Sequence, residues 1–259
     1  MASRVEIILV PDLRSSAVNA AGLLHSRQDL DVLLDFPETL EHEVNRFVGY
    51  QITYEQLIRT IRQRRILPEP LESWTYTAEP ILRALPRLKL ARPEVEAVCY
   101  TPAEAPFSAM ESATRIARLA FRVRATGKVE TDEWRDAISS CLTRSRELLD
   151  LEVSKLALRS RAREAACPAG LNAFRLKQRI AEYWDVATVR SAEPFYYRTP
   201  LEVLLCLSGR EISDEQLSVL ALAHVEYVYG YVLASRDRDE AHNRWVQEKI
   251  FRAKKHHRP

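Results

Sequence analysis

Acidic residues stand where three short apolar runs of the chain end. Asp12 follows the first run, Asp35 lies at the end of the second and Glu104 follows the third, and each has a proline close by. If the three runs are parallel strands, their carboxyl ends meet at one edge of a sheet, which is where ligands bind in open α/β sheets. The sequence therefore predicts a polar cleft that binds a charged ligand or a metal through carboxylates.

Neighbouring residues complete the ligand site that we expect at this edge. Arg14 would balance the carboxylates, Ser15 lies at the start of a helix whose N–H groups suit an anion, and Glu38 follows the second run. Asp35 and Glu38 are the candidate catalytic groups. No histidine or cysteine joins the set, so we expect no zinc site there, and the sequence identifies no cofactor. The alternative is that these are ordinary polar loop residues, with Arg14 in a surface ion pair.

An arginine and a histidine near the C-terminus form a second pattern. Arg236 precedes His242 by six positions, a spacing that resembles the signature of HEPN ribonucleases. The resemblance implies that the two side chains meet across a dimer, where they position and protonate an RNA phosphate. The basic stretch 252–258 would add contacts to nucleic acid. The other interpretation is a charged, solvated helix face with ion pairs one turn apart.

A further histidine, His224, shares an apolar helical stripe with Leu217 and Leu220. Such stripes usually face the core of a protein. We therefore expect a buried structural histidine rather than a metal ligand or a base.

The elements that must position these residues begin with three predicted strands. They are Val5–Val10, Leu30–Phe36 and Val95–Tyr100, nearly continuous apolar runs of the kind found in parallel sheets covered on both faces. Between the first two runs an apolar stripe predicts a helix with Ser15 or Ser16 as its N-cap. The fold class that we predict is α/β and rich in helix, with a small, mostly parallel sheet in the N-terminal half and a large helical complement.

Capping signals mark the starts of several helices. A Ser or Thr three residues before a Gln or Glu predicts a helix N-terminus, and the chain has three such pairs: Thr53 with Gln56, Thr199 with Glu202, and Ser213 with Gln216. Gly127 would end a helix in the middle of the chain. The last helix would run from Ser213 to about residue 253, with a weak point at Gly230.

The chain after the third run shows a helical pattern. A long charged helix is predicted from Thr131 to Arg163, with a break at Cys167–Gly170. We therefore expect an α/β half over residues 1–127, which opens with a βαβ unit, and an all-helical half over residues 128–259. No linker-like segment separates the halves, which predicts that they pack together as one domain.

The composition excludes several classes of protein. The 259 residues carry 38 Lys and Arg against 36 Asp and Glu, so the net charge of +2 excludes a strongly basic nucleic-acid binder. The 6 glycines are isolated and cannot form a phosphate-binding loop, and the 4 cysteines are too far apart for a zinc knuckle. We see no membrane-spanning run and no signal peptide, which predicts a soluble cytoplasmic protein. Arg outnumbers Lys 31 to 7, which fits a thermophilic, archaeal source or equally a GC-rich genome.

Three segments carry a likeness to a known family. They are Asp35–Glu38 (DFPE), Gly49–Glu55 (GYQITYE) and Trp74–Tyr76 (WTY). The third segment begins a predicted helix that precedes the third apolar run, which ends shortly before Pro102. With these segments the chain resembles, over about residues 4–136, the TraB/PrgY/GumN superfamily, which includes Tiki, ChaN-like and erythromycin-esterase-like proteins. The resemblance implies that Asp35 takes the acidic position of the family. The first turn of the family is usually Gly-x-x-His, and this chain has Pro11–Arg14 (PDLR) there.

These observations together predict a divergent TraB/Tiki-like protein that binds a small polar ligand or a protein partner at the strand ends. The missing histidine implies that the histidine-dependent hydrolase chemistry of the family is absent. Two alternatives stay open, a HEPN-like RNA nuclease that acts as a dimer and a helical protein–protein interaction module. Nucleic acid at the basic C-terminal stretch and a second copy of the chain are further expected partners, and no membrane is expected.

Overall fold

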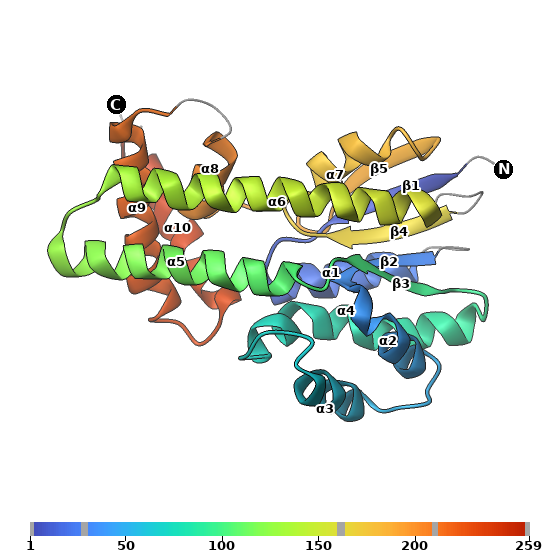
Figure 1. The fold of residues 1–259 in the computed structure, drawn as a ribbon. Coiled ribbons are helices and arrows are strands. Elements are labelled where there is room, and N and C mark those ends of the chain that lie inside the picture. Colours follow the sequence, from blue (N-terminus) through green and yellow to red (C-terminus); the bar gives the residue numbers. More distant parts are fainter. Residues whose placement is uncertain (1–2, 27–30, 160–163, 209–211, 257–259) are drawn as a thin grey trace. The chain divides into compact units, whose positions relative to one another are not determined.

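A computed structural model of the chain describes residues 3–26, 31–159, 164–208 and 212–256 (Figure 1). The chain divides into two compact units. The first, here called the α/β unit, comprises residues 1–108 and 146–194, and the second, the helical unit, comprises residues 109–145 and 195–259. The boundary predicted at residue 127 is therefore wrong, because the chain returns to the first unit at Arg146.

The α/β unit is built on a sheet of five parallel strands. Their order across the sheet is β3-β2-β4-β1-β5, and their bounds are β1 Arg4–Leu9, β2 Asp31–Pro37, β3 Ala97–Thr101, β4 Glu164–Ala169 and β5 Val186–Ser191. The predicted α/β class, rich in helix and with a parallel sheet, is confirmed. The three apolar runs are β1, β2 and β3, and of these β3 is buried along its whole length.

Two strands lie in the stretch that was expected to be all helical, so that expectation is wrong. The strand β4 has the sequence EAACPA, whose alanines have little strand propensity and whose Pro168 lacks the N–H that a central strand normally donates. It nevertheless occupies the centre of the sheet between β2 and β1. Small side chains suit this position because helices cover the sheet on both faces. The edge strand β5 alternates between half-buried and exposed residues and has no apolar run to reveal it.

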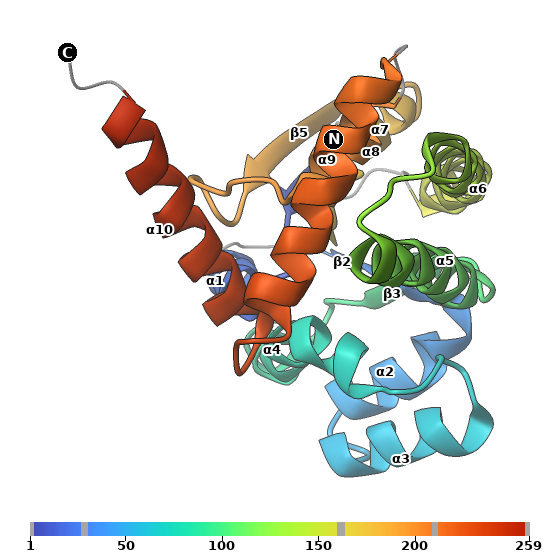
Figure 2. The same cartoon turned by 90° about the vertical axis from the view of Figure 1, so that its left-hand side faces the viewer.

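Helices cover the two faces of this sheet. One face carries α1 Arg14–His25, α2 Glu41–Val48, α3 Tyr54–Arg64 and α4 Glu72–Ala91, with the short turn η1 Glu38–Leu40 ahead of α2. The other face carries α7 Ala173–Ile180 and the C-terminal part of α6 Thr131–Arg159. Figures 1 and 2 both show α2 and α3 on the side of the sheet away from α6. Each face therefore has its own apolar core.

The start of α1 differs from the prediction. The N-cap is Leu13, which makes no side-chain capping bond, and Ser15 and Ser16 both lie inside the helix. Ser16 is fully buried there. An apolar N-cap gives no sequence signal, because the capping preference for Ser, Thr, Asp and Asn comes from a side-chain oxygen. The predicted capping box of α3 is confirmed, since the Thr53 side chain accepts a hydrogen bond from the Gln56 N–H and Gln56 returns one to Thr53.

The helical unit takes α8 Pro200–Leu207, α9 Asp214–Tyr227, η2 Val228–Val232 and α10 Arg238–His256, together with most of α5 Ala105–Thr126 and the start of α6. The capping boxes at Thr199 and Ser213 are confirmed, and Gly127 follows α5 with a φ of 71°. Residues 160–163, at the expected end of α6, lie outside the described residues. Among the residues that the structure describes, no helix is both long and apolar enough to cross a membrane.

The last helix, predicted from Ser213 to about residue 253 with a weak point at Gly230, is in fact two helices, and Gly230 lies in the turn that ends the first. A π-helical turn, η2, ends α9, and a new N-terminus forms where the Asp237 side chain accepts a hydrogen bond from the Glu240 N–H over 2.9 Å. The Glu240 carboxylate accepts in turn from the Arg236 N–H. Asp237 and Glu240 have the spacing of a capping box, so the sequence carried a start signal that the continuous periodicity concealed.

Candidate functional site at the carboxyl ends of the strands

A β-bulge places Asp35 at the edge of the sheet. The strand β2 pairs with β3 at Leu34 with Cys99 and again at Pro37 with Thr101, so two residues of β2 lie opposite one residue of β3. Asp35 is one of these two residues, and its side chain reaches solvent. Bulges change the direction of a side chain and are common beside functional sites.

Two hydrogen bonds hold the Asp35 carboxylate in place. The Thr101 hydroxyl on β3 donates to Oδ1 over 2.7 Å, and the Gly170 N–H at the end of β4 donates a second bond. Asp35 is thus tied to both strands that flank β2. The crowding of protein atoms around this carboxyl raises its pKa above the usual range, and the bonds from Thr101 and Gly170 oppose that rise.

A second carboxyl comes from the long helix α6. Glu152 is half-buried, between the buried residues Leu149 and Val153 of the same helix. Burial, with a smaller contribution from the charge on Asp35, raises the pKa of Glu152 to about 8. At neutral pH Glu152 is therefore mostly protonated, so its carboxyl can donate a hydrogen bond, while the carboxyl of Asp35 accepts those from Thr101 and Gly170.

A lysine links this pair to Glu38. Lys155 lies one helical turn after Glu152, and its Nζ is 2.5 Å from Glu38 Oε2. Its positive charge lowers the pKa of Glu152 and so limits the effect of burial. Of the residues predicted from the sequence, Asp35 and Glu38 are thus both tied to this stretch of α6, Asp35 through its charge on Glu152 and Glu38 through Lys155.

Beneath the two carboxyls the sheet presents a buried floor. Cys167 on β4 lies with its Sγ 3.6 Å from the Tyr100 hydroxyl on β3, and neither side chain is accessible to more than a trace of solvent. Burial raises the pKa of both groups above their usual ranges, and the charge on Asp35 adds to that rise. Both stay neutral, so Cys167 is a packing residue rather than a reactive thiolate.

The topology explains why a site forms at this edge. The chain leaves β2 through η1 toward the face covered by α2, and it leaves the neighbouring strand β4 toward the face covered by α7. Adjacent strands whose connections diverge in this way leave a crevice at their carboxyl ends. Asp35 and Gly170 lie at that switch point between β2 and β4.

The other predicted residues are placed differently. The Arg14 guanidinium pairs with Glu79 on α4 over 2.9 Å and donates to the Tyr76 carbonyl oxygen. Its position at the start of α1 directs it to α4. Asp12 and Ser15 follow β1, which β4 separates from β2, and both are exposed. Glu104 is exposed just before α5.

Glu152 was not predicted, although the sequence held a signal for it. In an amphipathic helix an acidic residue between two buried apolar positions is unusual, and Leu149, Glu152 and Val153 form such a set. The signal was hidden because α6 is rich in charged residues throughout.

Arg236 and His242 serve structural roles in the helical unit. Arg236 is exposed and pairs with Glu240 one turn later. His242 is buried, stacks on Tyr196 with 4.9 Å between ring centroids, and has its Nε2 2.7 Å from the Tyr197 carbonyl oxygen. The side chains of the basic stretch 252–258 lie outside the described residues. The prediction that His224 is buried is confirmed.

No family model, curated protein or solved structure matches this chain. Within the described ranges, no group of three or more His, Cys, Asp or Glu side chains is arranged to hold a metal ion. Any function must therefore be inferred from the geometry around Asp35 and Glu152.

Proposed function

We propose that this protein binds a small polar ligand at the carboxyl ends of β2, β3 and β4, with Asp35 and Glu152 as its main contacts. The observation that carries the proposal is the pairing of Asp35, which the Thr101 hydroxyl and the Gly170 N–H hold in place, with Glu152, a carboxyl whose pKa is about 8. The first accepts hydrogen bonds and the second donates one at neutral pH.

This pair selects the chemistry of the ligand. A hydroxyl or amide group both donates and accepts, so it can bridge an acceptor oxygen of Asp35 and the protonated carboxyl of Glu152. A strong cation would instead favour ionisation of both carboxyls and would release the proton of Glu152. A neutral ligand with hydroxyl or amide groups is therefore the best match, and the bound group would lie where a proton can pass between it and either carboxyl.

The proposal includes a distant kinship with the TraB/Tiki superfamily. It is supported by the place of Asp35, which lies near the end of the second strand along the chain, two residues before Pro37 and three before Glu38. Because His is missing from the turn after β1, the proposed role is ligand binding without the histidine-dependent hydrolysis of that superfamily.

Side-chain carboxyl NMR tests the proposal without knowledge of the ligand. The Glu152 resonance, assigned by loss of its signal in Glu152→Gln, should titrate near pH 8. Titration at the ordinary value of about 4.3 would refute the proposed pair.

A ligand screen then tests binding. Thermal shifts with a panel of neutral polyols and carboxamides should identify a stabilising compound, and Asp35→Asn should abolish its effect. Asp12→Asn is the matched control, because Asp12 is also exposed at a strand end but β4 separates its strand from β2. A shift that persists in Asp35→Asn, or disappears equally in Asp12→Asn, would contradict the assignment of the site.

A further inference from the structure

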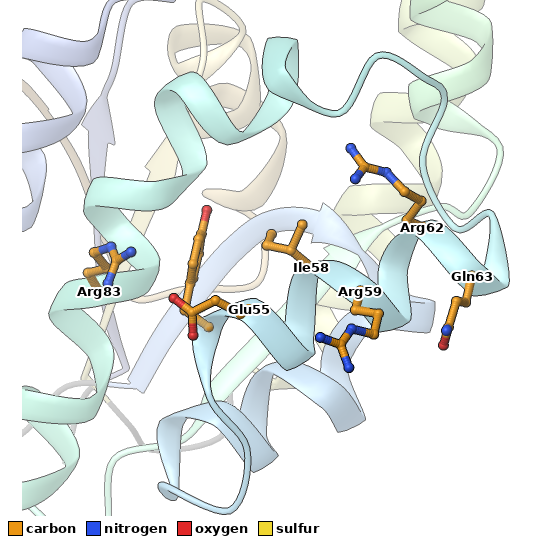
Figure 3. A pocket seen from close by; sticks show the side chains of 7 residues that line it. Glu55, Ile58, Arg59, Arg62, Gln63 and Arg83 are labelled. Carbon is orange, nitrogen blue, oxygen red and sulfur yellow. The ribbon is translucent and has the colours of Figure 1, made fainter.

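A hollow on the α/β unit lies between α3 and α4, where α3 supplies most of its lining (Figure 3). Its volume is about 550 Å³, and it is lined by Tyr54, Glu55, Ile58, Arg59, Arg62, Gln63 and Arg83. Sites for small molecules typically measure about 300–1,000 Å³. The hollow is thus large enough for a small-molecule ligand.

The floor of the hollow is apolar and fixed in position. The Tyr54 ring packs edge-on against Phe47 with 6.1 Å between centroids, and the Arg83 guanidinium lies 4.4 Å from its centroid. Burial and the nearby Glu79 raise the pKa of Tyr54 to about 12, so its phenol stays neutral. Ile58, half-buried one turn after Tyr54, extends this apolar surface. An aromatic or branched aliphatic group would find van der Waals contacts here.

The rim of the hollow is basic. Arg62 pairs with Glu69 and Glu72, and Arg83 pairs with Glu79, so these two guanidiniums are already engaged. Arg59 is exposed, and within the described residues it has no hydrogen bond or ion pair. Figure 3 shows its side chain on the rim, one turn of α3 after Glu55.

Glu55 does not neutralise Arg59. Its carboxylate accepts hydrogen bonds from its own N–H and from the Thr53 hydroxyl, which lowers its pKa and holds it at the start of α3. Arg59 is therefore a cation beside an apolar surface, with its hydrogen-bond donors available.

We propose that this hollow is a second binding site that takes a small amphipathic anion. The apolar body of the anion would pack on Tyr54 and Ile58, and its carboxylate, sulfonate or phosphate would pair with Arg59. The proposal is independent of the site at Asp35, because it uses other residues, the opposite charge and another class of ligand.

Two dyes that differ in charge test this site. The anion 8-anilinonaphthalene-1-sulfonate has an aromatic body and one sulfonate, and N-phenyl-1-naphthylamine is the same ring system without it. Fluorescence titration of the sulfonate dye should give saturable binding that Arg59→Gln weakens on the order of tenfold, the value of one charge-assisted hydrogen bond. Binding of the uncharged dye should change by less than about twofold in Arg59→Gln.

Two further variants locate the dyes. Ile58→Ser should weaken both dyes, since it removes apolar contact area. Arg87→Gln is the matched control for Arg59→Gln, because Arg87 is an exposed arginine of α4 that does not line the hollow. Circular dichroism melting of each variant would verify that it is folded.

Three results would overturn the proposal: no saturable binding of the sulfonate dye, equal affinities in Arg59→Gln and Arg87→Gln, or no loss in Ile58→Ser. Asp35→Asn should leave both dyes unaffected, so failure at one site is distinguishable from failure at the other.

Discussion

The Thr101 hydroxyl donates to the Asp35 carboxylate over 2.7 Å at the place where the pairing between β2 and β3 slips by one residue. The bond stabilises the bulge and holds the carboxylate at the edge of the sheet. It also opposes the rise in the Asp35 pKa that the surrounding protein atoms cause.

Thr101→Val should therefore raise the pKa of Asp35 further and destabilise the protein. The buried hydroxyl is replaced by a methyl group of similar shape, and the Asp35 carboxyl loses one of its donors, for an expected cost of about 1–3 kcal/mol. NMR titration and urea unfolding measure the two effects. Thr60→Val is the control, because the Thr60 hydroxyl bonds only to the Gln56 carbonyl oxygen within its own helix, over 3.0 Å. Equal losses in the two variants would contradict a special role for Thr101.

Glu152→Gln should stabilise the protein at alkaline pH. The pKa of Glu152 is about 8 in the folded chain and near its ordinary value when unfolded, so in that window the unfolded state binds fewer protons and stability falls as pH rises. The loss approaches about 1.4 kcal/mol per pH unit and is absent in the glutamine variant. Urea unfolding at pH 5 and pH 8.5 measures it. Glu147→Gln, at an exposed position of the same helix, should keep the pH dependence of the wild type.

Lys155→Met should move the Glu152 titration above pH 8, because the charge on Lys155 lowers that pKa. Arg14→Met should leave the titration unchanged, because Arg14 pairs with Glu79 on α4. It should cost only about 0.5–1 kcal/mol in stability, since the pair is partly exposed. The comparison is made by carboxyl NMR. A change in the pKa of Glu152 caused by Arg14→Met would show that the charge of Arg14 does contribute to the electrostatic potential at the strand ends.

His224 should make the helical unit sensitive to acid. Burial lowers its pKa to about 4, and its ring packs edge-on against Trp134 with 6.2 Å between centroids. Protonation favours the unfolded state, so stability should fall as pH drops from about 6.5 toward 4, by about 3 kcal/mol in total. Trp fluorescence in urea at pH 7 and pH 5 reports the change. His224→Leu should remove most of this acid-side loss, whereas His25→Gln, at an exposed position, should retain it.

The sequence predicted the elements whose signals are local. The strands β1, β2 and β3 are visible as apolar runs. The capping boxes at Thr53, Thr199 and Ser213 satisfy the free N–H groups of their own helix starts. Neither feature depends on the rest of the chain. The strand β4 could not be predicted in this way. Its small residues form a strand because β2 and β1 supply hydrogen-bonding partners on both sides and helices cover its faces.

The candidate site was predicted in part for the same reason. Asp35 and Glu38 follow directly from the end of β2. The bulge that exposes Asp35 depends on pairing with β3, and Glu152 approaches it from a helix more than a hundred residues later in the chain. The ion pair of Arg14 with Glu79 could not be predicted, because a sequence shows that a residue follows a strand but not which neighbouring helix its side chain meets.

The position of β4 in the sheet has a consequence for the order of folding. β1 pairs only with β4 and β5, so the first strand of the chain has no hydrogen-bonding neighbour until residues 164–169 have been synthesised. Until then this apolar segment is unpaired in the nascent chain, where it could aggregate. The contacts of β1 also join residues far apart in the sequence, which slows folding. A fragment cut at residue 127 would hold β2 and β3 as a pair and leave β1 without a partner.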